Sequence, residues 1–333
     1  MSKLITVFGA AGAQGSSVLR SLAANTSKSF ALRAIARNPT SDPATRLSDI
    51  GIEVVKADGW DKESMISAFK GTWAVFVNTN SDDPVFENLD ETRTEVDLGK
   101  RIVDAAVDAG VEVFVYSGMV SAREASGEKI PVAAFDDKYA IGEYAKATGT
   151  FKSVIIVSPG WYFENFLVPE MAPIFGGFPF NPCDDGTLVF RSPRWGGKED
   201  VPFINIGRDF GDIVHGVLLE PDRWAGKLVQ GVSDIQSLAD MVGMFEKATG
   251  KIAMFEEIPN WRDLEVYGIR ALETVKLIFG FVQEAGGKYY GVETEARTAA
   301  ELKRKAAEAS GKFGNDAKLS TLGKFFAENF GDK

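Results

Sequence analysis

The chain has 333 residues, a net charge of −10 and a single cysteine, so it can form a large core in two lobes but no intrachain disulfide. The acidic balance and the lack of a basic face argue against nucleic-acid binding, and no apolar run approaches the ~20 residues of a membrane span. Because no signal peptide precedes the first strand, we expect a cytoplasmic protein that binds neither nucleic acid nor membrane.

The N-terminal segment combines a strand, a glycine-rich turn and the start of a helix. Residues 5–8 are apolar and rich in β-branched side chains, and residues 16–24 show helical spacing. Between them, Gly9 can turn the chain sharply, Gly12 leaves room for a diphosphate, and Gly15 allows the helix to pack closely on the strand. Because a helix N-terminus attracts anions, the turn predicts a dinucleotide site. The expected contacts in the turn are Gly9, Ala11, Gly12, Ala13, Gln14 and Gly15.

The second predicted strand, residues 30–36, ends at Arg37, about twenty residues beyond the glycines. In NAD-binding folds this neighbourhood holds a carboxylate that binds the ribose 2′-hydroxyl. Here no carboxylate is present, and Arg37 stands with Asn38 and Thr40. A guanidinium pairs well with a 2′-phosphate, so the sequence predicts NADP(H) rather than NAD(H), with Arg37 and Asn38 as contacts. The alternative is that Arg37 is simply a surface cation after a strand.

Strands and helices continue to alternate along the first half of the chain. Further strands are expected over residues 52–56, 73–77, 111–116 and 154–157, with helices over residues 62–69, 87–109 and 132–147. This alternation predicts an α/β fold with a parallel, doubly wound sheet, whose ligands bind at the carboxyl ends of the strands. The side chains and turns expected at that edge, in addition to those above, are Asp58, Gly59, Asn78, Ser117 and Pro159.

The composition changes after the sixth predicted strand. We therefore place a dinucleotide-binding domain at residues 1–155 and a smaller, interleaved C-terminal α/β lobe at residues 156–333. Residues 161–190 are dense in Phe, Pro and Gly, and are interpreted as loop and short helix that form either an apolar wall over the cofactor or ordinary core. A strand over residues 203–206 and a helix over 212–219 are expected to return to the sheet. A small αβ unit is expected over residues 228–232, 236–248 and 252–256, and further helices over 264–284, 293–310 and 319–329.

Hydride chemistry also needs a proton donor, and the usual one is missing. Short-chain dehydrogenases place a Tyr four residues before a Lys on the helix after the fifth strand, so that both lie on one face. Here Ala134 precedes Lys138 by four residues, and no Tyr-x-x-x-Lys occurs in the chain. Tyr162, which follows the sixth strand, is a candidate replacement acid or an aromatic wall. His215, the only histidine, lies in an apolar helix and is expected to pack there, and with one His and one Cys no common zinc site is expected.

Four segments resemble the NmrA-like proteins, atypical members of the short-chain dehydrogenase/reductase superfamily. They are residues 7–15, the Phe-Asp-Asp-Lys at 135–138 with Glu143-Tyr144, residues 159–166 and residues 208–213. Ala11 stands where the family usually has Thr. The resemblance implies a Rossmann lobe, a smaller C-terminal lobe, NADP(H) binding and a lysine, Lys138, that is retained where the tyrosine is lost. Family members include NADP(H) sensors with little or no turnover and regulators that bind protein partners, whereas isoflavone-reductase-like relatives are NADPH reductases that use the Lys position.

Two functions remain open from the sequence. The missing tyrosine favours an NADP(H)-binding redox sensor or regulator with a protein partner, for which the family resemblance adds the nucleus as a location. The phenylalanine-dense lobe supports the alternative, an NADPH-dependent oxidoreductase that reduces an apolar or aromatic small molecule, with Lys138 holding the ribose or relaying a proton. An open apolar cavity beside the nicotinamide site favours the enzyme, and a filled one favours the sensor.

Overall fold

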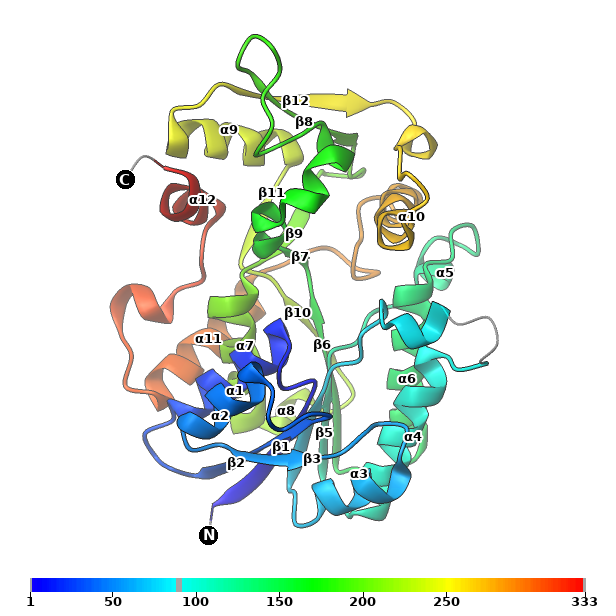
Figure 1. Cartoon of the computed structure of the whole chain (residues 1–333), viewed down its shortest axis with the longest axis vertical. Coiled ribbons are helices and arrows are strands. Elements are labelled where there is room, and N and C mark those ends of the chain that lie inside the picture. Colours follow the sequence, from blue (N-terminus) through cyan, green and yellow to red (C-terminus); the bar gives the residue numbers. More distant parts are fainter. Residues whose placement is uncertain (1, 88–91, 332–333) are drawn as a thin grey trace.

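A seven-stranded parallel sheet forms the centre of the computed structural model, which describes residues 2–87 and 92–331 (Figure 1). The strand order is β10-β6-β5-β4-β1-β2-β3, and every pairing is parallel. This confirms the predicted doubly wound sheet, and the order reverses between β1 and β4, where such sheets bind ligands. The strands are β1 (Lys3–Phe8), β2 (Phe30–Ala36), β3 (Glu53–Lys56), β4 (Ala74–Val77), β5 (Val113–Tyr116), β6 (Ser153–Pro159) and β10 (Leu228–Gly231).

Helices cover both faces of this sheet, and each buries an apolar stripe against it (Figure 1). In α4, for example, Leu98, Ile102 and Ala106 recur at helical spacing and are buried. One face carries α1 (Ala13–Ala23), α2 (Asp42–Asp49), α7 (Gly211–Leu219), α8 (Pro221–Trp224) and α11 (Arg297–Ala309). The other carries α3 (Lys62–Phe69), α4 (Glu95–Asp108) and α6 (Ala133–Ala147).

Two helices in this lobe differ from the sequence prediction. The helix expected over residues 87–109 begins only at Glu95, because Thr94 and Asp97 form a capping box that fixes its N-terminus, and residues 88–91 lie outside the described part. Helix α2 was not predicted at all. It follows Ser41 and carries Pro43 in its first turn, a helix-start pattern too short to show apolar periodicity.

The second lobe has an aromatic core of its own. A three-stranded sheet of order β11-β9-β7 and a parallel pair β8–β12 pack with several helices, seen at the top of Figure 1. Phe163, Phe166, Phe178 and Phe190 are buried in this core, so most of the phenylalanine-dense segment is core rather than a cavity wall. The elements are β7 (Trp161–Tyr162), β8 (Leu188–Pro193), β9 (Val201–Ile204), β11 (Asp234–Gln236), β12 (Ala253–Ile258), α5 (Ala122–Ala125), α9 (Leu238–Thr249), α10 (Arg270–Glu284) and α12 (Leu322–Phe330).

Two strand assignments of the sequence analysis are wrong. The strand expected over residues 203–206 to rejoin the main sheet is β9, which belongs to the three-stranded sheet. The strand expected over 228–232 in a small αβ unit is β10, which instead pairs with β6 in the main sheet. A short apolar run does not encode its partner strand, and only long-range packing decides between the two sheets. Helix α7 does return to the main sheet as expected.

Two further properties bear on the site. In residues 2–87 and 92–331, no helix has the length and apolar character needed to cross a bilayer. Within the same ranges, no three His, Cys, Asp or Glu side chains gather closely enough to hold a metal ion.

Candidate functional site: a dinucleotide cleft joined to an aromatic pouch

The three glycines of the first turn have separate structural roles. Gly9 adopts φ +77°, and a Cβ there would lie 2.8 Å from the Asn78 carbonyl oxygen. A Cβ on Gly15 would lie 2.3 Å from the Gly9 carbonyl oxygen, so this glycine lets α1 pack against the turn. At Gly12 a Cβ would meet only the Gly9 oxygen at 3.4 Å, so space above it is open. Because Gly12 caps α1 without a side-chain hydrogen bond, the helix can offer backbone N–H groups to an anion.

One cavity of about 910 Å³ runs along the carboxyl ends of β1 to β6. It brings together residues from all six strand ends, which the sequence analysis had selected separately. Gly15 is the exception, because it lies behind the turn and does not line the cavity. The predicted residues that line it are Gly9, Ala11, Gly12, Ala13, Gln14, Arg37, Asn38, Asp58, Gly59, Asn78, Ser117, Lys138, Pro159 and Tyr162.

At one end of the cavity, Arg37 and Asn38 follow β2 and Ser41 precedes α2. The Arg37 side chain is 75% exposed, and its Nη1 lies 3.6 Å from Oδ2 of Asp83. A cation this open can rearrange to meet an anion at low cost, and the nearby Asn38 and Ser41 offer further polar groups. This corner therefore suits a phosphate group, although Asp83 competes for the same guanidinium.

At the other end, six side chains form what we call the aromatic pouch. They come from α6, the segment after β6, the loop before β9, α10 and the chain beyond α10. None of the six carries a charge, and Trp195 and Tyr289 stack with their ring centroids 5.7 Å apart. The pouch therefore suits an uncharged, apolar or aromatic ligand. Its members are Phe135, Trp161, Met171, Trp195, Ile278 and Tyr289.

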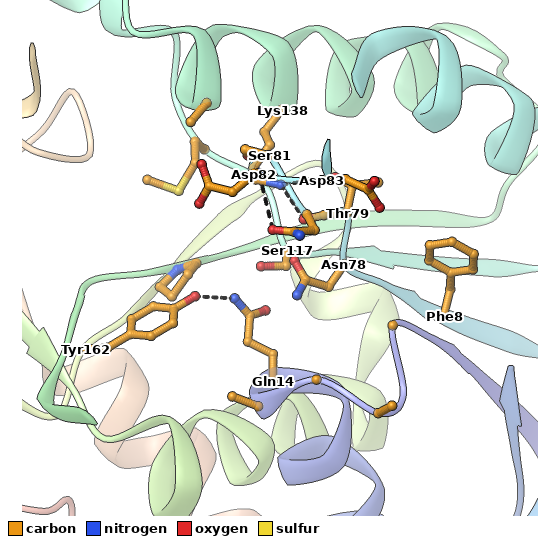
Figure 2. A pocket seen from close by; sticks show the side chains of 18 of the residues that line it. Phe8, Gln14, Asn78, Thr79, Ser81, Asp82, Asp83, Ser117, Lys138 and Tyr162 are labelled. Carbon is orange, nitrogen blue, oxygen red and sulfur yellow. Dashed lines mark hydrogen bonds between the residues drawn. The ribbon is translucent and has the colours of Figure 1, made fainter. Parts of the chain in front are cut away.

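Lys138 reaches from α6 into a buried polar cluster on the cavity wall (Figure 2). Its ammonium donates to Oε1 of Glu95 at 2.5 Å, to the Thr79 carbonyl oxygen at 2.7 Å and to Thr79 Oγ1 at 3.0 Å. The Thr79 hydroxyl in turn bonds Glu95 and lies 2.9 Å from the Tyr116 hydroxyl, whose pKa is held well above its usual range by burial. Since an ammonium has three N–H donors, those of Lys138 are fully used inside the protein.

Tyr162 and Gln14 point toward one another across the cavity (Figure 2). Gln14 Nε2 donates to the Tyr162 hydroxyl oxygen over 2.5 Å, while Oε1 of the same amide is buried without a partner among the described residues. Burial raises the pKa of Tyr162 to about 12, and the field of Glu164 acts in the same direction. The hydroxyl therefore stays protonated at neutral pH.

Comparison with known proteins places this chain in a family. The model of the NmrA-like family matches residues 1–310. The chain is 46% identical over 335 residues to the NmrA-like family domain-containing oxidoreductase FrzB of a Cladobotryum species, with 99% of each chain covered. It is 45% identical over 330 residues to the similarly described hkm9 of Aspergillus hancockii, with 99% of this chain and 97% of that one covered. The chain belongs to the NmrA-like family.

Solved structures share the fold of this NmrA-like chain at lower identity. NmrA, described as a negative transcriptional regulator in complex with NADP, matches with a TM-score of 0.73 at 19% identity, covering 99% of this chain and 95% of that one. The NADPH-dependent quinone oxidoreductase QOR2 of Escherichia coli, complexed with NADPH, matches with a TM-score of 0.67 at 19% identity, covering 98% and 99%. Both support the Rossmann-type fold.

Several cavity residues of this NmrA-like chain escaped the sequence analysis. Asn80, Ser81, Asp82 and Asp83 come after Asn78 and Thr79 in the segment that follows β4, and this polar run after a buried strand was a usable signal for them. The pouch residues Trp195, Ile278 and Tyr289 had no local signal, because distant segments bring them to the cavity. Glu95 was not selected, because it reads as one polar residue within the helix expected over residues 87–109, yet it is buried against Lys138.

Proposed function

We propose that this NmrA-like chain binds NADP(H) in the cavity and reduces an uncharged aromatic or apolar molecule held in the aromatic pouch. The observation that carries the proposal is the continuity of one cavity, which joins an anion-binding glycine turn to an uncharged aromatic wall. A redox sensor needs only the first of these two features. The names of the 46% and 45% identical relatives, both oxidoreductases, support the same choice.

The residues of the turn and the strand ends fit a dinucleotide. We assign the diphosphate to the open backbone at Gly12 and to the N-terminus of α1, and the extra phosphate of NADP(H) to Arg37 with Asn38 and Ser41. The unpaired Oε1 of Gln14 leaves a buried acceptor that a ligand amide can satisfy after a small side-chain adjustment. When bound, NADPH supplies a hydride to an electrophilic carbon.

The charge of the pouch limits the substrate. A carboxylate or ammonium placed among the six pouch side chains would lose its hydration without gaining a counter-ion. Lys138 cannot serve as that counter-ion without leaving Glu95 unpaired. Flat aromatic groups, in contrast, can pack against Trp161, whose side chain lines the cavity and is only partly buried. We therefore expect neutral carbonyl, enone or quinone compounds with an aromatic ring to be reduced in preference to acids or amines.

NADPH oxidation at 340 nm with a panel of neutral aryl ketones, enones and quinones tests the proposal, with carboxylated analogues as the matched panel. We expect turnover of neutral compounds only. The control variant is Ile278→Trp, which fills the pouch but leaves the glycine turn intact. It should raise KM roughly tenfold or more while the Kd of NADPH stays within about twofold.

Tight NADPH binding without turnover of any neutral compound would overturn the reductase and favour the sensor. Turnover that Ile278→Trp leaves unchanged would place the substrate outside the pouch.

A further inference from the structure

Tyr162 stands where the two parts of the cavity meet. It belongs to β7, follows Trp161 of the aromatic pouch, and is bonded through its hydroxyl to Gln14 beside the glycine turn (Figure 2). Its ring packs against the core of the main sheet and its hydroxyl is bonded to Gln14, so both ends of the side chain are held in place. This is the position of a group that can reach a ligand in the pouch and a cofactor over the turn.

The hydrogen-bond inventory of Tyr162 leaves one proton uncommitted. A phenol can donate one hydrogen bond and accept others, and the bond to Gln14 uses an N–H of the amide as donor. The phenolic proton therefore has no acceptor among the residues that the structure describes. A hydroxyl that is fixed by one bond and still has its own proton free is prepared to donate to a ligand oxygen or nitrogen.

Other cavity groups do not combine these features. The three N–H donors of Lys138 are used by Glu95 and Thr79, and the Tyr289 hydroxyl donates to the Pro159 carbonyl oxygen at 3.4 Å. Ser117 also lines the cavity, but an alcohol is a far weaker acid than a phenol. Tyr162 is thus the phenol in the described part of the cavity whose proton is free to transfer.

We propose that Tyr162 is the proton donor of this reductase, with Gln14 as the positioning residue that orients its hydroxyl. The assignment rests on the proposed function. As hydride adds to the substrate carbon, the C=O π pair moves onto oxygen, and that oxygen takes the proton from Tyr162 Oη. The phenolate then takes a proton from water in the open cavity, so each turnover consumes one proton and one hydride.

The surroundings of Tyr162 set its pH behaviour. The charged group whose field acts on it is Glu164, and Tyr289 is the other titratable side chain coupled to it. No cation among the described residues contributes, so the pKa of Tyr162 stays near 12, whereas a neighbouring lysine would lower it. Reduction should therefore show no ionisation of the donor between pH 6 and about 10.

The test compares Tyr162→Phe with Tyr144→Phe, the same substitution at an α6 hydroxyl that bonds Asp104 and does not line the cavity. Tyr162→Phe should lower kcat about 100-fold or more with the Kd of NADPH within about twofold, whereas Tyr144→Phe should stay within about threefold of the natural chain. A second readout needs no turnover. With ¹³C at the Cζ of all 7 tyrosines, the NMR signal missing in Tyr162→Phe should not titrate below about pH 10.5 and should shift when a neutral aryl ketone binds with NADP⁺.

The outcomes separate the inference from the function beneath it. If the natural chain reduces neutral compounds and Tyr162→Phe reduces them equally well, the donor is another group and only this inference fails. A Tyr162 signal that does not shift when the ketone and NADP⁺ bind would also overturn it, because the hydroxyl would then not meet the ligand. If the natural chain reduces none of the compounds, the reductase itself fails and the assignment of a donor fails with it.

Discussion

Two polar clusters border the same cavity and differ in how completely their hydrogen bonds are used. In the closed cluster, Lys138, Glu95, Thr79 and Tyr116 satisfy one another, and the Lys138 and Glu95 side chains are only 13% and 3% exposed. In the open cluster, Gln14 holds Tyr162 but leaves one acceptor and one proton without partners in the described structure.

The difference teaches which side chains stabilise the fold and which are prepared for a ligand. A buried group whose donors and acceptors are all used inside the protein stabilises the folded state. Removing it leaves its partners buried without a hydrogen bond or counter-ion. A group with an unused donor or acceptor can form that hydrogen bond only when a ligand binds. Closed groups should therefore change stability when they are replaced, and open groups should change binding or turnover.

Lys138→Met is expected to have the largest effect, on stability. It leaves the buried carboxylate of Glu95 without its counter-ion, which costs about 3–5 kcal/mol of unfolding free energy. Urea unfolding followed by circular dichroism measures this loss. The double variant Lys138→Met with Glu95→Leu should recover most of it, since no charge is then stranded. If Lys138→Met alone lost less than about 1 kcal/mol of unfolding free energy, the Lys138–Glu95 pair would not be the buried, fully bonded pair described above.

His215 forms a second closed cluster, and its effect should appear as a pH dependence. Asn25 Nδ2 lies 3.0 Å from Nε2, the Ser21 hydroxyl lies 3.1 Å from Nδ1, and burial lowers the pKa of His215 to about 4. Because the unfolded chain binds this proton near pH 6.5, stability is complete above that pH and falls as the pH drops toward 4. Between pH 6.5 and 5 the loss should be about 1.5 kcal/mol.

Unfolding titrations at several pH values check this prediction, with His215→Gln as the control. The variant should be less stable at pH 7. Since His215 is the only histidine, the free energy of unfolding of the variant should change little between pH 6.5 and 5. A slope that survives in the variant would assign the effect to other groups.

Arg37 is an open group, so its replacement should change affinity rather than stability. Arg37→Asp should weaken the binding of NADPH about ten- to a hundredfold. The affinity for NADH should stay nearly unchanged or rise, because the lost guanidinium contacts only the 2′-phosphate, which NADH lacks. Fluorescence titration measures both nucleotides. Asp83→Asn, which removes the competing carboxylate, should tighten NADPH by about threefold. Equal affinities of the natural chain for the two nucleotides would contradict the role of Arg37.

Gln14→Met should lower turnover, and by less than Tyr162→Phe does. The variant keeps the volume of the side chain but removes the bond to the Tyr162 hydroxyl. Steady-state kinetics at saturating NADPH should show kcat lowered about tenfold, with the KM of the carbonyl substrate and the unfolding midpoint close to those of the natural chain. A loss of stability without a change in kcat would show that Gln14 stabilises the fold and does not orient the Tyr162 hydroxyl.

The dinucleotide end of the cavity was predictable because its residues follow directly from local sequence. Each strand end contributes the next one or two residues, as with Arg37 after β2 and Ser117 after β5, and parallel strands bring their carboxyl ends to one edge. The glycine spacing likewise fixed the turn from Gly9 to Gly15. Local order was therefore enough to bring fourteen selected residues to one cavity.

The pouch end was not predictable, because no local pattern marks a residue that a distant segment brings to a cavity. Trp195 precedes β9 and Tyr289 follows α10, and each reads as ordinary core. The exchanged places of β9 and β10 have the same origin, since both are short apolar runs. The pairing of Glu95 with Lys138 also joins two helices that are far apart along the chain.

The most direct test of the account is nucleotide binding by Gly12→Asp, beside Gly12→Ser. With φ −78° and ψ 170° at a helix N-cap, position 12 accepts either residue, and both are good caps, so the unfolding midpoint should hold or rise slightly. An aspartate at this turn should repel the diphosphate and raise the Kd of NADPH about 100-fold or more, with a smaller increase for the neutral serine. A folded Gly12→Asp chain that binds NADPH as tightly as the natural one would contradict the placement of the cofactor over this turn.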